Sequence, residues 1–86
     1  MPTISEFFGI TVRIYYDDHN PPHFHAYYGS EEALIGLENL EILSGHLPRR
    51  AKAMVIEWAI EYRKELKENW MRAERHEPLS PITPLE

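Results

Sequence analysis

The densest group of chemically active side chains in this sequence lies within nine residues, Asp17-Asp18-His19-Asn20-Pro21-Pro22-His23-Phe24-His25. The segment holds three of the five histidines of the chain, next to two consecutive aspartates. Imidazole nitrogens and carboxylate oxygens bind divalent metals such as zinc. Imidazole also titrates near neutral pH, so it can act as a general acid or base. The segment therefore predicts a functional site with two alternative chemistries.

Each chemistry assigns its own roles to these residues. As a metal site, the segment offers His19, His23 and His25 as ligands for a divalent ion such as zinc. As an acid–base site, it places the catalytic role on His23 and His25, with Asp17 or Asp18 orienting the imidazoles. A third interpretation is that these are polar residues on an exposed strand face beside a turn. Because an His-x-His pair alone is a weak signal, the residues leave all three interpretations open.

A predicted β-strand positions the two later histidines. Apolar and polar residues alternate over residues 23–28, the period of a strand. Strand parity puts His23 and His25 on the face opposite Phe24, so we expect the imidazoles to point away from the core. Pairing apolar positions across the two neighbouring hairpins then sets Tyr15 and Gly36 beside His25, and Asp17 and Glu38 beside His23.

The remaining elements follow from similar patterns. Alternation predicts further strands over residues 10–16, 33–37 and 40–43. From Leu47-Pro48 to about His76, apolar residues recur at three- and four-residue spacing, which predicts one long helix. The expected fold is α+β, with a three- to four-stranded antiparallel sheet followed by one long helix packed on one face. Residues 1–76 are predicted to form a single α+β domain and residues 77–86 a proline-rich C-terminal tail.

The length of that helix raises a question about its second half. At 1.5 Å per residue the predicted helix would measure about 40 Å, which is longer than a domain of this size is wide. Its second half must bend back, fray or meet a partner, and a homo-oligomer through the helix is one possibility. The tail has no helical or strand period, so it is extended, disordered or draped over the body.

Composition and charge exclude some classes of function. The chain has 86 residues, no cysteine and a net charge of −5, which excludes disulfides and thiolate zinc sites. Residues 1–48 carry one basic residue against seven acidic ones, so this half lacks the basic surface typical of nucleic-acid binding. The sequence also lacks an apolar run long enough for a membrane span and a signal-peptide pattern. We therefore expect a cytoplasmic protein that does not bind membranes.

Three basic residues stand out against this background. Arg49, Arg50 and Lys52 fall in the first turn of the predicted helix, where the helix dipole disfavours positive charge. Such a choice suggests another use, so these residues are candidates for binding a phosphate or an acidic partner. The alternative is that they are solvated surface residues.

Several segments carry a family resemblance. MPTISEFFGI, DDHNPPHFHAYYG, LEILSGHLPRRA and the later EW and NW pairs resemble a small bacterial family catalogued as domain of unknown function 4160. The resemblance covers nearly the whole chain and implies no established activity, but members of that family are associated with toxin–antitoxin systems. The order of histidine strand, hairpin, short strand, Gly-x-Leu-Pro turn and helix is also similar to HicA-like mRNA interferases. By that analogy alone, His23 or His25 would act in RNA cleavage.

These observations give one leading hypothesis and two alternatives. The leading hypothesis is a toxin–antitoxin component that acts through a cognate small protein partner and RNA, with ribonuclease-like acid–base chemistry if it is an enzyme. The first alternative is a non-enzymatic interaction module that uses the helix end, Trp70 and the proline tail. The second is a histidine-based metal-binding protein. The sequence does not decide whether the protein is an enzyme.

Overall fold

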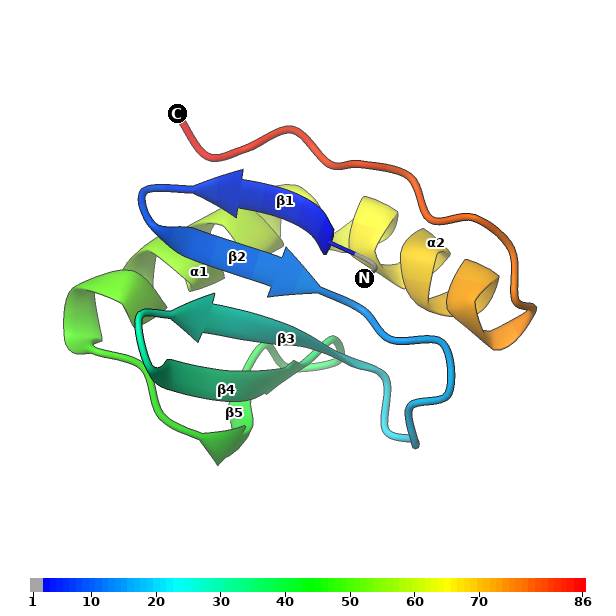
Figure 1. Cartoon of the computed structure of the whole chain (residues 1–86), viewed down its shortest axis with the longest axis horizontal. Helices are drawn as coiled ribbons and strands as arrows, with labels where there is room; N and C mark the ends of the chain where they lie inside the picture. Colours follow the sequence, from blue (N-terminus) through cyan, green and yellow to red (C-terminus); the bar gives the residue numbers. More distant parts are fainter. Residues whose placement is uncertain (1–2) are drawn as a thin grey trace.

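An antiparallel sheet precedes the helical part of the chain in the computed structural model, which describes residues 3–86 (Figure 1). Within these residues the sheet has five strands in sequential order, followed by two helices. The strands are β1 Thr3–Phe7, β2 Ile10–Arg13, β3 His23–Tyr28, β4 Glu31–Gly36 and β5 Ile42–Gly45, and the helices are α1 Arg49–Glu61 and α2 Arg63–Glu74. The predicted α+β class is confirmed, while the first two residues of the predicted domain 1–76 lie outside the described residues.

The strand count exceeds the three or four that the sequence predicts. The additional strand is β1, which pairs with β2 through an irregular register between Thr3 and Ser5. Because of this bulge, Ile4 and Ser5 are both buried, and the apolar–polar alternation that marks a strand is lost. The last strand also lies slightly later than predicted, over Ile42–Gly45 instead of residues 40–43.

The register of β3 differs by two residues from the prediction. His23 lies opposite Gly36, and His25 lies opposite Leu34 on one side and Arg13 on the other. The predicted neighbours of His25, Tyr15 and Gly36, are therefore wrong as register partners. A two-residue turn joins Tyr28 to Glu31 and fixes the β3–β4 pairing. Since the error is an even number of residues, the predicted face of each side chain is still correct.

The predicted long helix is interrupted at Tyr62, whose φ of −111° and ψ of 27° are not helical. Its apolar stripe continues across the interruption, with Trp58, Leu66 and Trp70 buried. An uninterrupted helix of the predicted length, about 40 Å, would exceed the molecule's longest extent of 33 Å. Neither helix within residues 3–86 combines the length and apolar composition needed to cross a bilayer.

The core lies between one face of the sheet and the two helices. Trp58 of α1 is fully buried at its centre, with ring centroids 5.3 Å from Phe7 and 6.0 Å from Phe24. Val55, Ala59 and Leu66 extend this contact along the helices. One face of β3 is therefore fixed against the core, and parity fixes the two histidines on its other face.

The C-terminal tail packs against the body of the protein. It runs alongside β1 (Figure 1), where the Ile82 amide donates a hydrogen bond of 2.8 Å to the Ile4 carbonyl. The side chain of Ile82 is buried, and Leu79 and Leu85 are half-buried. Of the paths expected for this segment, the structure shows the draped one.

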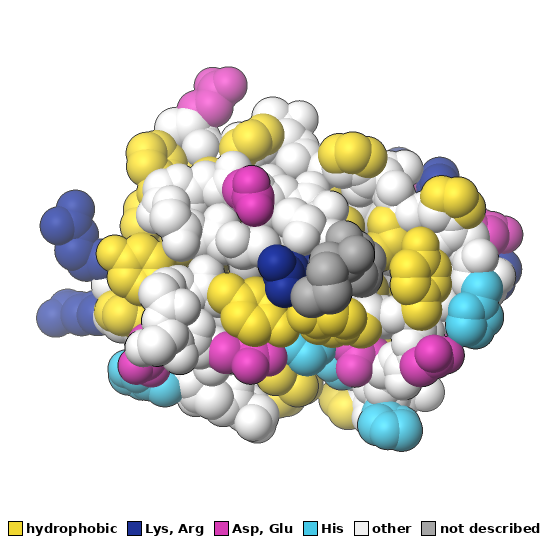
Figure 2. Space-filling model, in the orientation of Figure 1, with side chains coloured by type: hydrophobic (Ala, Val, Ile, Leu, Met, Phe, Trp, Pro, Cys, Tyr) yellow, Lys and Arg dark blue, Asp and Glu magenta, His cyan; other side chains and the backbone are white. Residues whose placement is uncertain are grey.

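Charge is unevenly distributed over the surface shown in Figure 2. Lysine and arginine side chains project at the end where α1 begins, while acidic and histidine side chains follow the lower edge of the view. The basic end includes the exposed Arg49 and Arg50.

Candidate functional site

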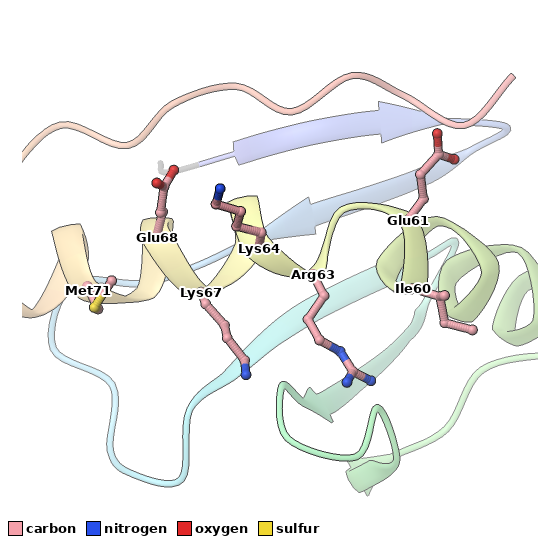
Figure 3. A pocket seen from close by; sticks show the side chains of 7 residues that line it. All are labelled: Ile60, Glu61, Arg63, Lys64, Lys67, Glu68 and Met71. Atoms are coloured by element: carbon pink, nitrogen blue, oxygen red, sulfur yellow. The ribbon is translucent and has the colours of Figure 1, made fainter.

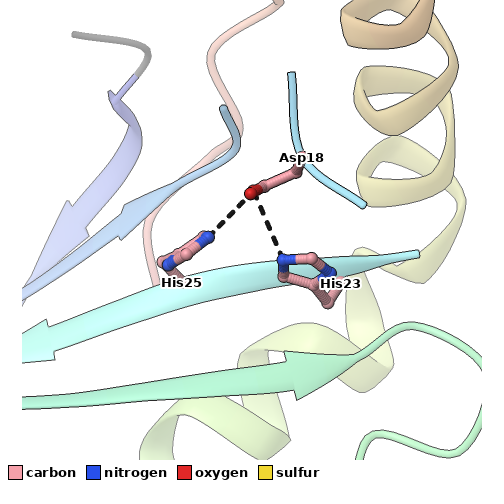
Figure 4. Close-up of side chains that lie close together, drawn as sticks. All are labelled: Asp18, His23 and His25. Atoms are coloured by element: carbon pink, nitrogen blue, oxygen red, sulfur yellow. Dashed lines mark hydrogen bonds and ion pairs between the residues drawn. The ribbon is translucent and has the colours of Figure 1, made fainter. Parts of the chain in front are cut away.

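Three side chains from two segments converge beside the sheet. His23 and His25 project from β3, and Asp18 reaches them from the loop between β2 and β3 (Figure 4). The Asp18 Oδ2 atom lies 2.9 Å from His25 Nε2 and 3.3 Å from His23 Nε2. One ligand atom from each residue lies within 4.8 Å of the other two. A single carboxylate oxygen thus faces both imidazoles.

The two imidazoles are buried, which corrects the prediction of an exposed strand face. His23 is 5% and His25 is 9% exposed. The Tyr15 ring packs edge-on against His25 at 4.7 Å between centroids, and the Trp70 ring lies 5.2 Å from His23. The β2–β3 loop therefore covers His25 on the face opposite the core, and Trp70 of α2 lies against His23.

The Nδ1 atoms of both histidines, which point away from Asp18, have hydrogen-bonding partners. His23 Nδ1 lies 2.8 Å from the Pro21 carbonyl oxygen, and His25 Nδ1 lies 3.1 Å from Glu32 Oε2. Since a carbonyl oxygen only accepts, His23 Nδ1 must carry a proton, and when Nε2 carries no second proton its lone pair faces Asp18. Metal-binding histidines show the same arrangement, with the other ring nitrogen bonded to a carbonyl or a carboxylate.

One atom of the site lacks a hydrogen bond. Among the described residues, the buried His23 Nε2 has no hydrogen-bonding partner, although Asp18 Oδ2 lies 3.3 Å away. A buried polar atom left unpaired costs about 1–3 kcal/mol. A cation held by this lone pair and the facing carboxylate would remove that cost.

A tyrosine pair borders the site. The hydroxyl groups of Tyr15 and Tyr27 are 2.7 Å apart, and the Tyr27 ring stacks on His25 at 6.3 Å. Burial, the hydrogen bond with Tyr15 and the nearby negative charge of Glu32 all raise the pKa of Tyr27 above its ordinary value. The phenol is therefore held in its neutral form next to the imidazole.

The other predicted site residues of this segment lie apart from the cluster. His19 is exposed on the loop, and the structure does not bring it to His23 and His25. Asp17 is also exposed, and its Oδ1 lies 3.6 Å from Nε2 of His76 at the end of α2. Asp18 alone of the predicted aspartates contacts the imidazoles.

Sequence reasoning missed Glu32 and the Pro21 carbonyl. It named Glu38 instead, because its register was displaced by two residues. The Gly29-Ser30 turn carried the necessary signal, since a two-residue turn pairs Tyr27 with Glu32 and so places Glu32 diagonally across from His25.

The predicted anion-binding residues lie at the other end of the molecule. Arg49, Arg50 and Lys52 are exposed at the start of α1, far in Figure 1 from the beginning of β3. Arg49 and Arg50 line a hollow of about 520 Å³ together with Phe8 and Tyr28. These cations and the imidazoles therefore cannot contact the same phosphate group.

A hollow of about 610 Å³ lies on the outer surface of the helices (Figure 3). Arg63 and Lys67 point to one side of it, while Lys64 and Glu68 point to the other. Its polar side chains diverge, whereas those of the histidine cluster converge on one oxygen. The cluster is thus the better candidate for chemistry.

Comparison with known proteins gives one match. The family model described as Domain of unknown function (DUF4160) matches residues 9–71, a span that includes Asp18, His23, His25 and Glu32. No curated protein and no solved structure matches the chain.

Proposed function

The chain belongs to the DUF4160 family, and from the geometry of its buried histidines we propose that it is a divalent-metal-binding protein. The ligands are Asp18, His23 and His25, so Asp18 takes the place that the sequence hypothesis gave to His19. The observation that carries the proposal is the orientation of the two imidazoles: acceptors hold both Nδ1 atoms outward, and both Nε2 atoms face one carboxylate oxygen.

The spacing of the donor atoms supports this proposal. Zinc lies about 2.0–2.1 Å from nitrogen and carboxylate ligands, so two of its ligand atoms are about 2.9 Å apart at a right angle and about 3.3 Å apart at a tetrahedral angle. The two nitrogen–oxygen distances of the site are 2.9 and 3.3 Å. Small side-chain movements would therefore admit an ion of this size.

The donor set also indicates the class of metal. Two imidazoles and one carboxylate suit zinc and other divalent transition metals better than calcium or magnesium, which prefer oxygen ligands. Glu32 would fix the His25 ring and offset part of the positive charge of the ion. Asp18 has the most exposed side chain of the three, at 23%, so solvent and the ion would reach the site from that side.

Calorimetric titration of the chelator-treated protein with zinc chloride tests the proposal. We expect one ion per chain, with affinity reduced at least about 100-fold in Asp18→Asn and His25→Gln, because each loses a ligand atom. The visible spectrum of bound Co²⁺ would report nitrogen and oxygen ligation independently. His19→Gln, which alters the exposed loop histidine, is the matched control. Failure of the folded wild-type protein to bind zinc, or equal loss in His19→Gln, would contradict the proposal.

A separate variant tests the role of Glu32. We expect Glu32→Gln to weaken zinc binding about 10–100-fold, as other losses of a partner to a metal-bound histidine do. Glu31→Gln is the control because it removes the same charge from the adjacent position of β4. Equal losses of zinc affinity in the two variants would show that only the general charge matters, and that the hydrogen bond from His25 to Glu32 has no specific role.

The other hypotheses stay predictions. A toxin–antitoxin role, a cognate protein partner, an RNA substrate and a homo-oligomer through the helix are supported only by resemblance and sequence pattern. Metal binding is preferred to ribonuclease chemistry because both imidazoles are buried and the basic residues lie at the far end. Cleavage of mixed cellular RNA by the wild-type protein, lost in His25→Ala, would reverse this preference.

A further inference from the structure

The C-terminal tail repeats every three residues. It reads Pro78-Leu79-Ser80, Pro81-Ile82-Thr83, Pro84-Leu85-Glu86. Burial follows the same repeat, because Leu79, Ile82 and Leu85 are buried or half-buried while the prolines and the third residues are exposed. Three residues per turn is the period of a polyproline II helix. The tail therefore presents one apolar edge to the body of the protein.

The body of the protein forms hydrogen bonds to main-chain atoms of the tail. Asn69 donates to the Ser80 carbonyl and accepts from the Ser80 amide, each at 2.8 Å. The Trp58 indole donates to the Thr83 carbonyl at 2.8 Å, and the Ile4 carbonyl accepts from the Ile82 amide at 2.8 Å. These bonds require no particular tail side chain, so any segment with the same period and apolar edge can form them.

The receptor groups are built into the domain. Asn69 is 1% exposed and Trp58 is fully buried with the tail in place, and the hydrogen bonds of both side chains are made to main-chain atoms of the tail. Both residues lie within the span matched by the family model, residues 9–71, whereas the tail lies beyond it. Two of the receptor residues, Trp58 and Asn69, thus belong to the matched domain, whereas β1 and the tail lie outside it.

We propose that this groove, formed by β1, Trp58 and Asn69, is a binding site for an extended proline-rich segment of a partner protein, and that the tail fills it in cis. Other recognition modules also bind polyproline II segments in aromatic-lined grooves, but here the edge that contacts the groove is Leu79, Ile82 and Leu85, and the prolines hold the segment extended. This proposal is independent of the metal centre.

The connection between α2 and the tail favours a partner segment over a tail exchanged with a second copy. The His76 amide bonds to the Ala73 carbonyl and the Glu77 amide to the Arg72 carbonyl, at 3.1 and 2.9 Å. This turn directs the residues that follow it into the groove of the same molecule. A partner segment needs only to displace the residues that follow it.

Binding of a fluorescent synthetic peptide with the sequence of residues 77–86 tests the proposal. The receptors are the full-length wild type and full-length Ile82→Asp, in which a buried charge releases the tail. A short tether gives the resident tail a millimolar effective concentration, so we expect Ile82→Asp to bind the peptide at least about tenfold more tightly than the wild type. A peptide with Asp in place of Ile82 should not bind, and adding Asn69→Ala to the released protein should abolish binding.

Three outcomes would overturn the proposal. The first is that Ile82→Asp is folded by near-ultraviolet circular dichroism but does not bind the peptide, or binds the control peptide equally. The second is that Ile82→Asp and the milder Leu85→Asp both unfold, because the tail would then be an obligatory part of the core. The third is that the wild type elutes as a dimer whose labelled tails cross-link between copies, which would make a second copy the occupant.

Discussion

Each ring nitrogen of His25 faces a carboxylate, Asp18 at Nε2 and Glu32 at Nδ1. Either a proton or a metal ion between Nε2 and Asp18 can satisfy both groups. Protons and metal therefore compete for the same atom, and metal affinity should fall as the solution becomes more acidic. In the proposed metal site, Glu32 would not be a ligand but would hold the His25 ring in place through its hydrogen bond to Nδ1.

Tyr27 gives a prediction for alkaline solution. Its raised pKa, caused first by burial and then by the Tyr15 hydrogen bond and Glu32, means that the folded state keeps a proton that the unfolded state releases near pH 10. This contribution to stability is complete below about pH 10 and is lost as pH rises further towards the pKa of the folded state. We expect the free energy of unfolding, measured by urea titration, to fall less steeply above that pH in Tyr27→Phe than in the wild type. Identical pH profiles would contradict this assignment.

Among the elements, β5 places Gly45 directly against the backbone of β4. Its φ is +84°, and a Cβ atom there would overlap the Glu32 carbonyl oxygen and lie 3.0 Å from Ala33 Cα. Gly29 also has a positive φ, +58°, but a Cβ there would meet no atom within 4 Å. Replacing each glycine by alanine therefore distinguishes two effects: backbone strain alone at Gly29, and backbone strain with steric overlap at Gly45.

We expect Gly29→Ala to lower the free energy of unfolding by about 1 kcal/mol, the cost of the left-handed conformation alone. Gly45→Ala should cost clearly more, because β5 must also move away from β4. Since Glu32 supports His25, Gly45→Ala should weaken zinc binding as well, and Gly29→Ala should not. Urea unfolding and zinc titration of both variants check this, and equal losses of stability would contradict it.

The elements differ in how well the sequence predicts them. Alternation located β3 and the face of its histidines, because neither depends on the exact register. Strand β1 was not predicted because its bulge buries the consecutive residues Ile4 and Ser5, which removes the alternation that marks a strand. The break in the helix at Tyr62 was not predicted because Trp58, Leu66 and Trp70 keep their helical spacing on both sides of it.

For the whole molecule, a bound metal would join parts that are distant in sequence. The β2–β3 loop supplies Asp18, β3 supplies the imidazoles, and Trp70 of α2 packs on His23. Zinc at 100 times its Kd would add about 2.7 kcal/mol to stability, which corresponds to an increase in Tm of about 10–20 °C for a domain of this size. Thermal unfolding should show this increase in the wild type and its reversal by a chelator. An equal increase in Asp18→Asn would place the binding elsewhere.

Two features of the whole molecule could not be predicted from the sequence: the inward-facing residue of the β2–β3 loop and the docking of the tail. The sequence identified the segment in which two imidazoles and a carboxylate converge. It could not choose among Asp17, Asp18 and His19, because the path of a loop decides which side chain turns inward. The prolines of the tail are evident in the sequence, but the segment has neither a helical nor a strand period. The period of three becomes informative once Asn69 and Trp58 are seen to bond to that segment.

The sequential strand order has a consequence for how the chain folds. Every pairing within the described sheet joins strands that are consecutive in the sequence, so the sheet can form from local hairpins with little loop-closure entropy. The bond between Ile4 and Ile82 instead closes almost the full length of the chain. Such distant contacts form slowly and late. We therefore expect the tail to dock last during folding, and to open in native-state hydrogen exchange while the sheet stays protected.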